Sequence, residues 1–167
     1  KYDILKVFIT ASGGTSYSYY KHKVQRTKGN RKMILENEKI KQALEYIKEE
    51  DLATTQDTLN MCQIPAPSYK EEKKAEYIRE RFREIGLRDV RIDAVGNVLG
   101  IWPGTGEGPS VMLAAHTDTV FPEGTDLTIR KEGNRYYCPG INDDTHAVAE
   151  MIAVAKAMIH ADLHTKG

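Results

Sequence analysis

The first part of the chain after residue 33 shows a helical spacing of apolar residues. Ile40, Ala43, Leu44 and Ile47 fall at i, i+3, i+4 and i+7, which is the stripe of an amphipathic helix. Polar residues fill most of the positions between them. The pattern therefore predicts a first helix over residues 34–50.

Two more helices are predicted to follow. Residues 52–61 continue as a second helical segment, which Pro65 helps to end because proline lacks a backbone donor. Ser68 and Glu71 have the spacing of a capping box, which predicts that a third helix opens at Ser68. Gly86 suits the left-handed position that closes such a helix.

The period then changes from helical to extended. Val90 and Ile92 alternate with charged residues, and residues 98–102 form a second apolar run. The pair Gly96 and Asn97 lies between them and is typical of a turn. These features predict a β-hairpin.

The remaining elements complete an α/β pattern. Residues 110–115 form a short apolar run, which predicts a strand covered on both faces. Residues 127–131 and 135–138 predict a second hairpin across the turn at 133–134. A broad apolar face over residues 145–160 predicts a final helix. Helices before and after a group of strands predict an α/β fold with helices flanking a central mixed sheet.

Charge divides the chain into two parts. The whole chain carries 24 basic and 24 acidic residues, but residues 1–32 hold eight Lys or Arg against one acidic residue, a net charge of +7. The rest holds sixteen against twenty-three, a net charge of −7. Residues 1–32 are therefore expected to be a basic leader outside the core, with the natural start at Met33. Nucleic-acid binding is an alternative for this leader, but its basic residues lack helical periodicity.

Other classes are disfavoured by composition. No segment approaches the roughly 20 apolar residues that span a bilayer, so no membrane role is expected. Cys62 and Cys138 are far apart in sequence and form no CxxC motif, so a disulfide framework is not expected. The default location is a reducing cytoplasm.

The candidate chemistry lies in two short motifs. His116 and Asp118 follow the apolar run that predicts a buried strand, and Asp143 and Asp144 precede the last predicted helix. Taken alone, the aspartates are more typical of helix caps and His116 of a loop histidine. Their joint placement favours a metal site, because open α/β sheets bind ligands at the carboxyl ends of their strands.

The residue types fit zinc. Zinc accepts imidazole nitrogen and carboxylate oxygen, which His116 and Asp143 would supply. Asp118 could hydrogen-bond the other imidazole nitrogen and fix the tautomer. His146, next to the aspartate pair, is a candidate for substrate contact, and solvent exposure is the favoured interpretation for His160 and His164, which are at the end of the last helix.

The motifs resemble those of a known family. Residues 116–120 and 139–145 are similar to the two metal-binding motifs of the co-catalytic di-zinc exopeptidases and deacylases, which include peptidase T, carboxypeptidase G, aminoacylase and desuccinylase enzymes. Residues 64–68 and 96–98 also resemble that family. The similarity covers residues 33–167.

The resemblance implies a role for each motif residue. His116 would ligate one zinc ion, Asp118 would orient it, and Asp143 would bridge two zinc ions, with a cis peptide bond between Asp143 and Asp144. Cobalt or manganese could replace zinc. The implied reaction is hydrolysis of the amide bond of small peptides or N-acyl amino acids by metal-activated water, with no nucleic-acid or membrane partner.

The chain departs from the family pattern in two ways. His146, Ala147 and Val148 stand where relatives often carry glycine. The family's general-base glutamate, its remaining ligands and its dimerisation domain lie beyond the matched residues, so the chain is expected to be an amino-terminal part of the enzyme, inactive alone. A homodimer would form through that further domain. A non-enzymatic α/β binding module is the alternative function.

Overall fold

The computed structural model describes residues 4–10, 34–106 and 108–167. The helices are α2 (Glu38–Glu49), α3 (Asp51–Cys62), α4 (Glu72–Glu84) and α5 (His146–His160). The strands are β1 (Ile4–Thr10), β2 (Arg88–Ile92), β3 (Val98–Pro103), β4 (Met112–His116), β5 (Arg130–Glu132) and β6 (Arg135–Tyr137). A short π-helical turn, η1 (Ile141–Thr145), directly precedes α5.

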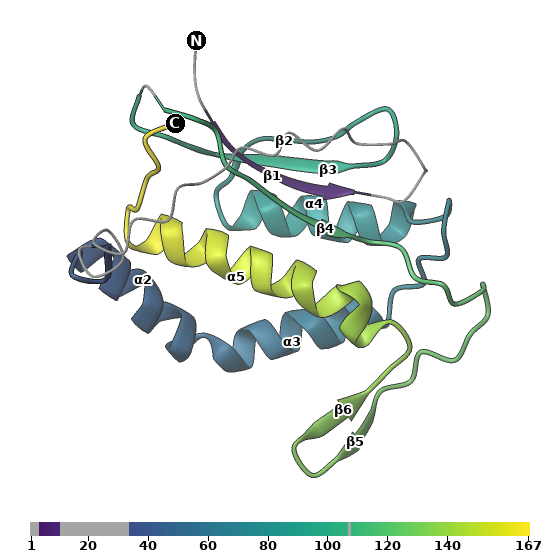
Figure 1. Ribbon diagram of the computed structural model, residues 1–167. Helices are drawn as coiled ribbons and strands as arrows, with labels where there is room; N and C mark the ends of the chain where they lie inside the picture. Colours follow the sequence, from purple (N-terminus) through teal and green to yellow (C-terminus); the bar gives the residue numbers. More distant parts are fainter. Residues whose placement is uncertain (1–3, 11–33, 107) are drawn as a thin grey trace, which may run out of the picture.

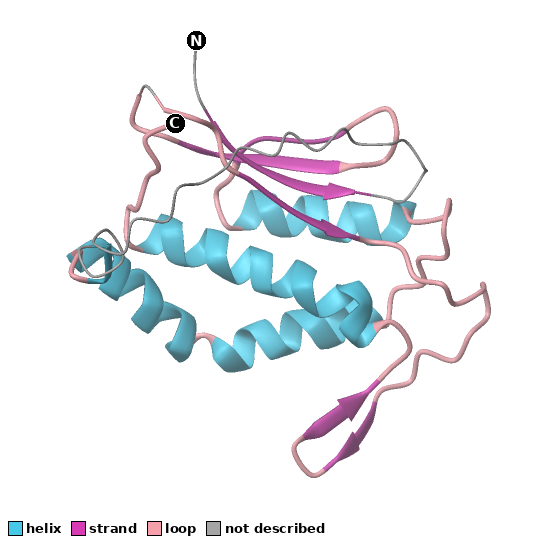
Figure 2. Ribbon diagram, viewed as in Figure 1, coloured by secondary structure: helices cyan, strands magenta, loops and turns pink. Residues whose placement is uncertain are grey.

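Four of these strands form a mixed sheet with the order β2-β3-β1-β4. β1 runs antiparallel to β3 and parallel to β4. Figure 1 shows the helices on one side of this sheet: α4 packs against β2 and β3, α5 packs against β4, and α2 and α3 pack against α5. The secondary-structure colouring in Figure 2 shows the same layers. The predicted α/β class with a mixed sheet is confirmed.

The position of β1 differs from the expectation for the basic leader. Ile4 pairs with Pro103 of β3, and Thr10 pairs with His116 of β4, so residues 4–10 lie inside the sheet. The charge count obscured a short run rich in β-branched residues, which favour strands. For residues 4–10, the expectation of a leader outside the core is corrected. The rest of the leader lies outside the described residues.

A side-chain cap sets the start of α2, but not the start of α4. The side chain of Asn37 accepts a hydrogen bond from the backbone N–H of Ile40 at 3.3 Å, so the first helix begins at Glu38. The third predicted helix begins at Glu72 rather than at Ser68, and its amino terminus has no side-chain cap. Gly86 adopts a φ of +88° after α4, as predicted.

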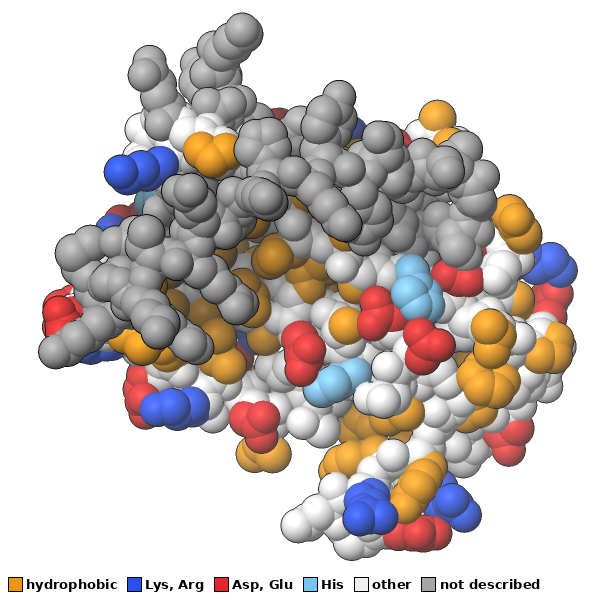
Figure 3. Space-filling model, viewed as in Figure 1, with side chains coloured by type: hydrophobic (Ala, Val, Ile, Leu, Met, Phe, Trp, Pro, Cys, Tyr) orange, Lys and Arg blue, Asp and Glu red, His pale blue; other side chains and the backbone are white. Residues whose placement is uncertain are grey.

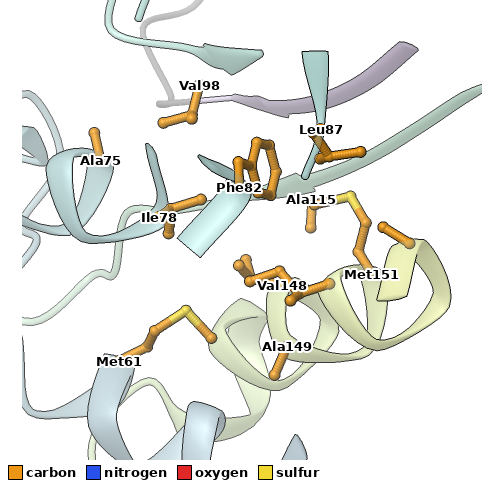
Figure 4. Close-up of a cluster of buried hydrophobic side chains, with 12 residues drawn as sticks. Met61, Ala75, Ile78, Phe82, Leu87, Val98, Ala115, Val148, Ala149 and Met151 are labelled. Carbon is orange, nitrogen blue, oxygen red and sulfur yellow. The ribbon is translucent and has the colours of Figure 1, made fainter. Parts of the chain in front are cut away.

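The core lies between the sheet and the helices, as Figure 4 shows. Ile78 and Phe82 of α4, Val98 of β3 and Ile152 of α5 are fully buried. Each such side chain contributes roughly 1.5–3 kcal/mol by leaving water. This packing fixes α4 and α5 against the strands.

β4 is covered less completely than its apolar sequence suggests. Ala115 packs into the core, but Met112 remains 55% exposed. β4 lies at the edge of the described sheet, and the described helices cover one face of it. The prediction that this strand is covered on both faces is therefore wrong.

The second hairpin is confirmed. β5 and β6 pair antiparallel from Arg130–Tyr137 to Glu132–Arg135, and Gly133 takes a φ of +57° in the turn.

Among the described residues, no helix is long and apolar enough to cross a membrane.

Candidate metal site

His116 ends β4 and lies between two carboxylates. Its Nε2 atom is 3.0 Å from Oδ1 of Asp143, and its Nδ1 atom is 3.1 Å from Oδ1 of Asp118. The two aspartates come from segments on opposite sides of the β5–β6 hairpin in sequence. The fold therefore brings the three residues predicted for the site into one cluster.

Asp118 is held by a loop that precedes α4. The Ser68 hydroxyl donates to Oδ2 of Asp118 at 2.7 Å. Beside it, the backbone N–H of Thr119 donates to the carbonyl of Ala66 at 2.7 Å, and Pro67 and Thr119 form a parallel bridge. Asp118 is buried. This arrangement fixes the carboxylate that faces Nδ1 of His116.

The turn η1 presents the aspartate pair. Asp143 and Asp144 have non-helical backbone angles, and the peptide bond between them is cis, as the resemblance implied. Oδ2 of Asp144 accepts a hydrogen bond from the backbone N–H of His116 at 3.1 Å. The Asp143 side chain remains 83% exposed. One carboxylate thus fixes the turn to β4, and the other faces solvent and the imidazole.

Gly140 allows the turn to approach the loop after β4. Its φ is +74°, and a Cβ atom there would lie 2.5 Å from Cγ2 of Thr119. A side chain at this position would push the turn away from residues 118–119. The close approach helps to place Asp143 beside His116.

The electrostatics of the cluster favour a protonated imidazole in the metal-free protein. Partial burial lowers the pKa of His116, but the hydrogen bond to Asp143 and the charges of Asp118 and Asp144 outweigh it and raise the pKa above its usual 6.5. A cation between the same groups would replace that proton. Two carboxylates around one imidazole therefore form a site for positive charge.

The donor atoms have a spacing that fits zinc. With bonds of about 2.0–2.1 Å, two ligands of a tetrahedral zinc ion lie roughly 3.3 Å apart. The observed 3.0 Å between His116 Nε2 and Asp143 Oδ1 is close to this value. Within the described residues, however, no group of three or more His, Cys, Asp or Glu side chains is arranged to hold a metal. The described chain thus supplies a pair of ligands.

A family model matches the part of the chain that contains both motifs. Residues 97–166 match the model described as "Peptidase family M28". This part of the chain is therefore similar to that peptidase family. The segment extends from the start of β3 through α5 and includes His116 and Asp143.

Relatives in several organisms support the same type of family. A protein of Pyrococcus abyssi, provisionally named LysW-lysine/LysW-ornithine hydrolase, is 45% identical over 60 residues, which are 36% of this chain and 17% of that protein. A protein of the same provisional name from Thermococcus kodakarensis is 37% identical over 60 residues, with the same coverage. The uncharacterized protein YgeY of Escherichia coli is 36% identical over 88 residues, which are 52% of this chain and 21% of YgeY.

These similarities support a family of the exopeptidase or deacylase type for the matched part of the chain. The peptidase family and the hydrolase-named relative both indicate a hydrolytic enzyme of the metallopeptidase type, that is, one that acts on peptide or amide bonds. The chain spans about a fifth of the length of the curated relatives that it matches.

His146 lies beside the cluster without joining it. Its Nδ1 atom is 3.1 Å from the Thr58 hydroxyl, and its Nε2 atom is 3.3 Å from Oε1 of Glu150. It also lines a cavity of about 300 Å³ between α3 and η1, together with Thr55, Leu59, Tyr136 and Ile141. Figure 3 shows histidine and acidic side chains gathered on the face of the molecule that lies close to the β5–β6 hairpin.

The last two histidines lie elsewhere. His160 is exposed and stacks on Tyr46 with ring centroids 4.2 Å apart, which agrees with the expected solvent exposure. His164 is half-buried instead, because it stacks on Trp102 at 4.6 Å and its Nδ1 atom lies 2.6 Å from the carbonyl of Pro103.

The sequence does not reveal the site contacts of three residues. Its spacing indicates a helix cap for Ser68 and a motif position for Asp144, and it gives no role to Lys74. Lys74 is 1% exposed, and its ammonium group donates to the Thr145 hydroxyl of η1 at 3.4 Å. The charged residue on an otherwise apolar face of α4 was the signal that could have revealed Lys74.

Proposed function

We propose that the protein containing these residues hydrolyses the amide bond of small peptides or N-acyl amino acids, using zinc held by His116 and Asp143. The observation that carries this proposal is the 3.0 Å distance between His116 Nε2 and Asp143 Oδ1. The family match over residues 97–166 supports the reaction class.

Each residue of the cluster has a distinct part in this proposal. Neutral His116 would offer Nε2 to the metal while its Nδ1–H donates to Asp118. Asp118, fixed by Ser68, would keep the imidazole in that tautomer. The exposed carboxylate of Asp143 has two oxygens and could serve two cations. When bound, zinc would lower the pKa of a water molecule and polarise the scissile carbonyl.

The substrate would lie next to the exposed carboxylate. The cavity of about 300 Å³ begins at Ile141 and His146, on the side of η1 that faces α3. Its size suits a small side chain, and Thr55 and Tyr136 offer hydroxyl groups for orientation. This position supports a small peptide or N-acyl amino acid as substrate. The closer relationship to peptidase T and carboxypeptidase G remains a prediction.

The same proposal includes the resident metal, the oligomeric state and the location of the protein. We expect zinc as the resident metal, with cobalt or manganese able to replace it. We also expect a homodimer formed through a further domain, no nucleic-acid or membrane partner, and a cytoplasmic location. Further ligands and a general base would come from residues beyond the matched segment.

Zinc binding by the protein expressed from its full reading frame tests the proposal. His116→Ala and Asp143→Asn should each weaken zinc binding at least tenfold and abolish hydrolysis of dipeptides and N-acyl amino acids. His160→Ala is the matched control, because this histidine is exposed and stacks on Tyr46. Equal zinc affinity in all variants, with no hydrolysis, would instead support the non-enzymatic binding module.

A further inference from the structure

Two cysteines that are distant in sequence lie close together in the structure. Cys62 ends α3 and is buried, and Cys138 follows β6 and is half-buried. The Cys138 thiol lies 3.5 Å from the carbonyl of Cys62 and 3.4 Å from the carbonyl of Leu127. The two cysteine side chains are also close enough to interact, and this interaction raises the pKa of the Cys62 thiol. The long sequence separation that argued against a disulfide framework therefore does not keep the sulfur atoms apart.

The two thiols differ in their access to solvent. Cys138 lines a surface cavity of about 660 Å³ with Ile129, Tyr136, Tyr137 and Ile141. Cys62 is 2% exposed, and burial, followed by the hydrogen bond to Cys138, raises its pKa to about 12. A reagent from solvent would therefore meet Cys138 first.

A buried cation completes the cluster. The ammonium group of Lys74 is close enough for its charge to act on both thiols, and it favours the thiolate form of Cys62. Such a charge matters because the thiolate is the attacking species in disulfide exchange. Burial lowers the pKa of Lys74, and the nearby thiols and Asp118 oppose that change.

We propose that Cys62 and Cys138 form a reversible disulfide by exchange with a low-molecular-weight disulfide, with Lys74 favouring the second step. In the first step, the Cys138 thiolate attacks the small disulfide, a mixed disulfide forms on Cys138, and one small thiolate leaves with the proton that Cys138 released. In the second step, the Cys62 thiolate attacks the Cys138 sulfur, and a second small thiolate leaves with the Cys62 proton. Two protein thiols are oxidised, and one small disulfide is reduced to two thiols.

The position of the pair gives the link a structural consequence. Cys138 precedes Pro139 and Gly140, which lead into η1 and Asp143. A bond to Cys62 would tie this segment to the carboxyl end of α3. The thiol pair thus connects a redox reaction to the segment that carries the acidic turn.

The experiment treats the reduced, folded chain with glutathione disulfide and follows it by intact mass and peptide mapping. The wild-type chain should gain one glutathione on Cys138 and then lose it as the Cys62–Cys138 disulfide forms. Cys62→Ala should stop at the mixed disulfide, and Cys138→Ala should remain unmodified. Dithiothreitol should restore both thiols.

Lys74→Met tests the role of the buried charge with a side chain of similar length. The mixed disulfide should accumulate, because loss of the charge lowers the thiolate fraction of Cys62. For each unit by which the Cys62 pKa rises, conversion should slow about threefold, since a tenfold smaller thiolate fraction is partly offset by a more nucleophilic thiolate. Circular dichroism checks that this variant is folded. If Lys74→Met does not fold, the two cysteine variants still test disulfide formation. A wild-type chain that stays unmodified, stops at the mixed disulfide, or forms the link only in urea overturns the proposal. Conversion at the wild-type rate in folded Lys74→Met removes the role of Lys74.

Discussion

The Ser68 hydroxyl donates a 2.7 Å hydrogen bond to the Asp118 carboxylate, which in turn faces Nδ1 of His116. A residue 50 positions earlier in the chain thus fixes the group that orients the imidazole. Partners of metal ligands typically change metal affinity 10–100-fold when they are removed.

Ser68→Ala should therefore weaken zinc binding roughly tenfold, because Asp118 loses its donor while the metal ligands remain. Asp118→Asn should weaken zinc binding at least as much, since the amide NH2 group is a donor and cannot accept the hydrogen bond from Nδ1–H of His116. Competition with a chromogenic chelator measures both affinities. Thr125→Ala is a control hydroxyl deletion, because Thr125 donates to the carbonyl of Pro122 in an exposed loop. If Ser68→Ala binds zinc like the wild-type chain, Ser68 does not support the site.

The raised pKa of His116 predicts the pH dependence of the metal-free protein. Protonated His116 is stabilised in the folded state, so this contribution is complete below the unfolded pKa of about 6.5 and is lost as the pH rises through the higher folded pKa. NMR titration of the imidazole should show a midpoint above 6.5. Asp143→Asn should lower that midpoint.

The same protonation opposes metal binding. Because the folded pKa is raised, acidification should begin to release zinc at a higher pH than expected for a histidine with an ordinary pKa. Zinc affinity measured as the pH is lowered tests whether protonation of His116 weakens metal binding. Affinity that stays constant down to pH 6 would contradict it.

Gly140→Ala should destabilise the turn. The substitution forces an L side chain to a φ of +74° and places Cβ 2.5 Å from Thr119 Cγ2. Gly124→Ala is the matched control, because Gly124 has a φ of +86° with no heavy atom within 4 Å of the added Cβ. Both variants carry the backbone cost, so Gly140→Ala should lose about 1–3 kcal/mol more in unfolding free energy. Urea denaturation of the two variants measures this difference, and equal losses would exclude the steric explanation.

Phe82→Ala tests the core that joins α4 to the sheet. Phe82 is fully buried, and it lies against Gly100 of β3, where an added Cβ would be 2.8 Å from its ring. The substitution should cost about 3–5 kcal/mol of unfolding free energy. Leu52→Ala, at a position 82% exposed on α3, should change stability by about 0.5 kcal/mol or less. Thermal and urea denaturation compare the two.

Local patterns determined most of the elements. The stripe at Ile40 and Ile47 predicted the first helix, and the turn at Gly133 predicted the second hairpin; both are present. Spacing decides these elements because each is formed by residues close together in sequence. Spacing does not decide their boundaries, because α4 begins at Glu72 and the capping-box spacing predicted Ser68.

The site was predictable as a pair of motifs and not as a complete environment. The sequence by itself singled out His116, Asp118 and Asp143, because an imidazole and carboxylates beside predicted strand and helix ends suit a cation. Only the tertiary structure decided that β1 enters the sheet, that Ser68 reaches Asp118, and that Lys74 lies buried behind η1. Those relationships join residues far apart in the chain, and their energies depend on distance and burial, which exist only once the layers have packed.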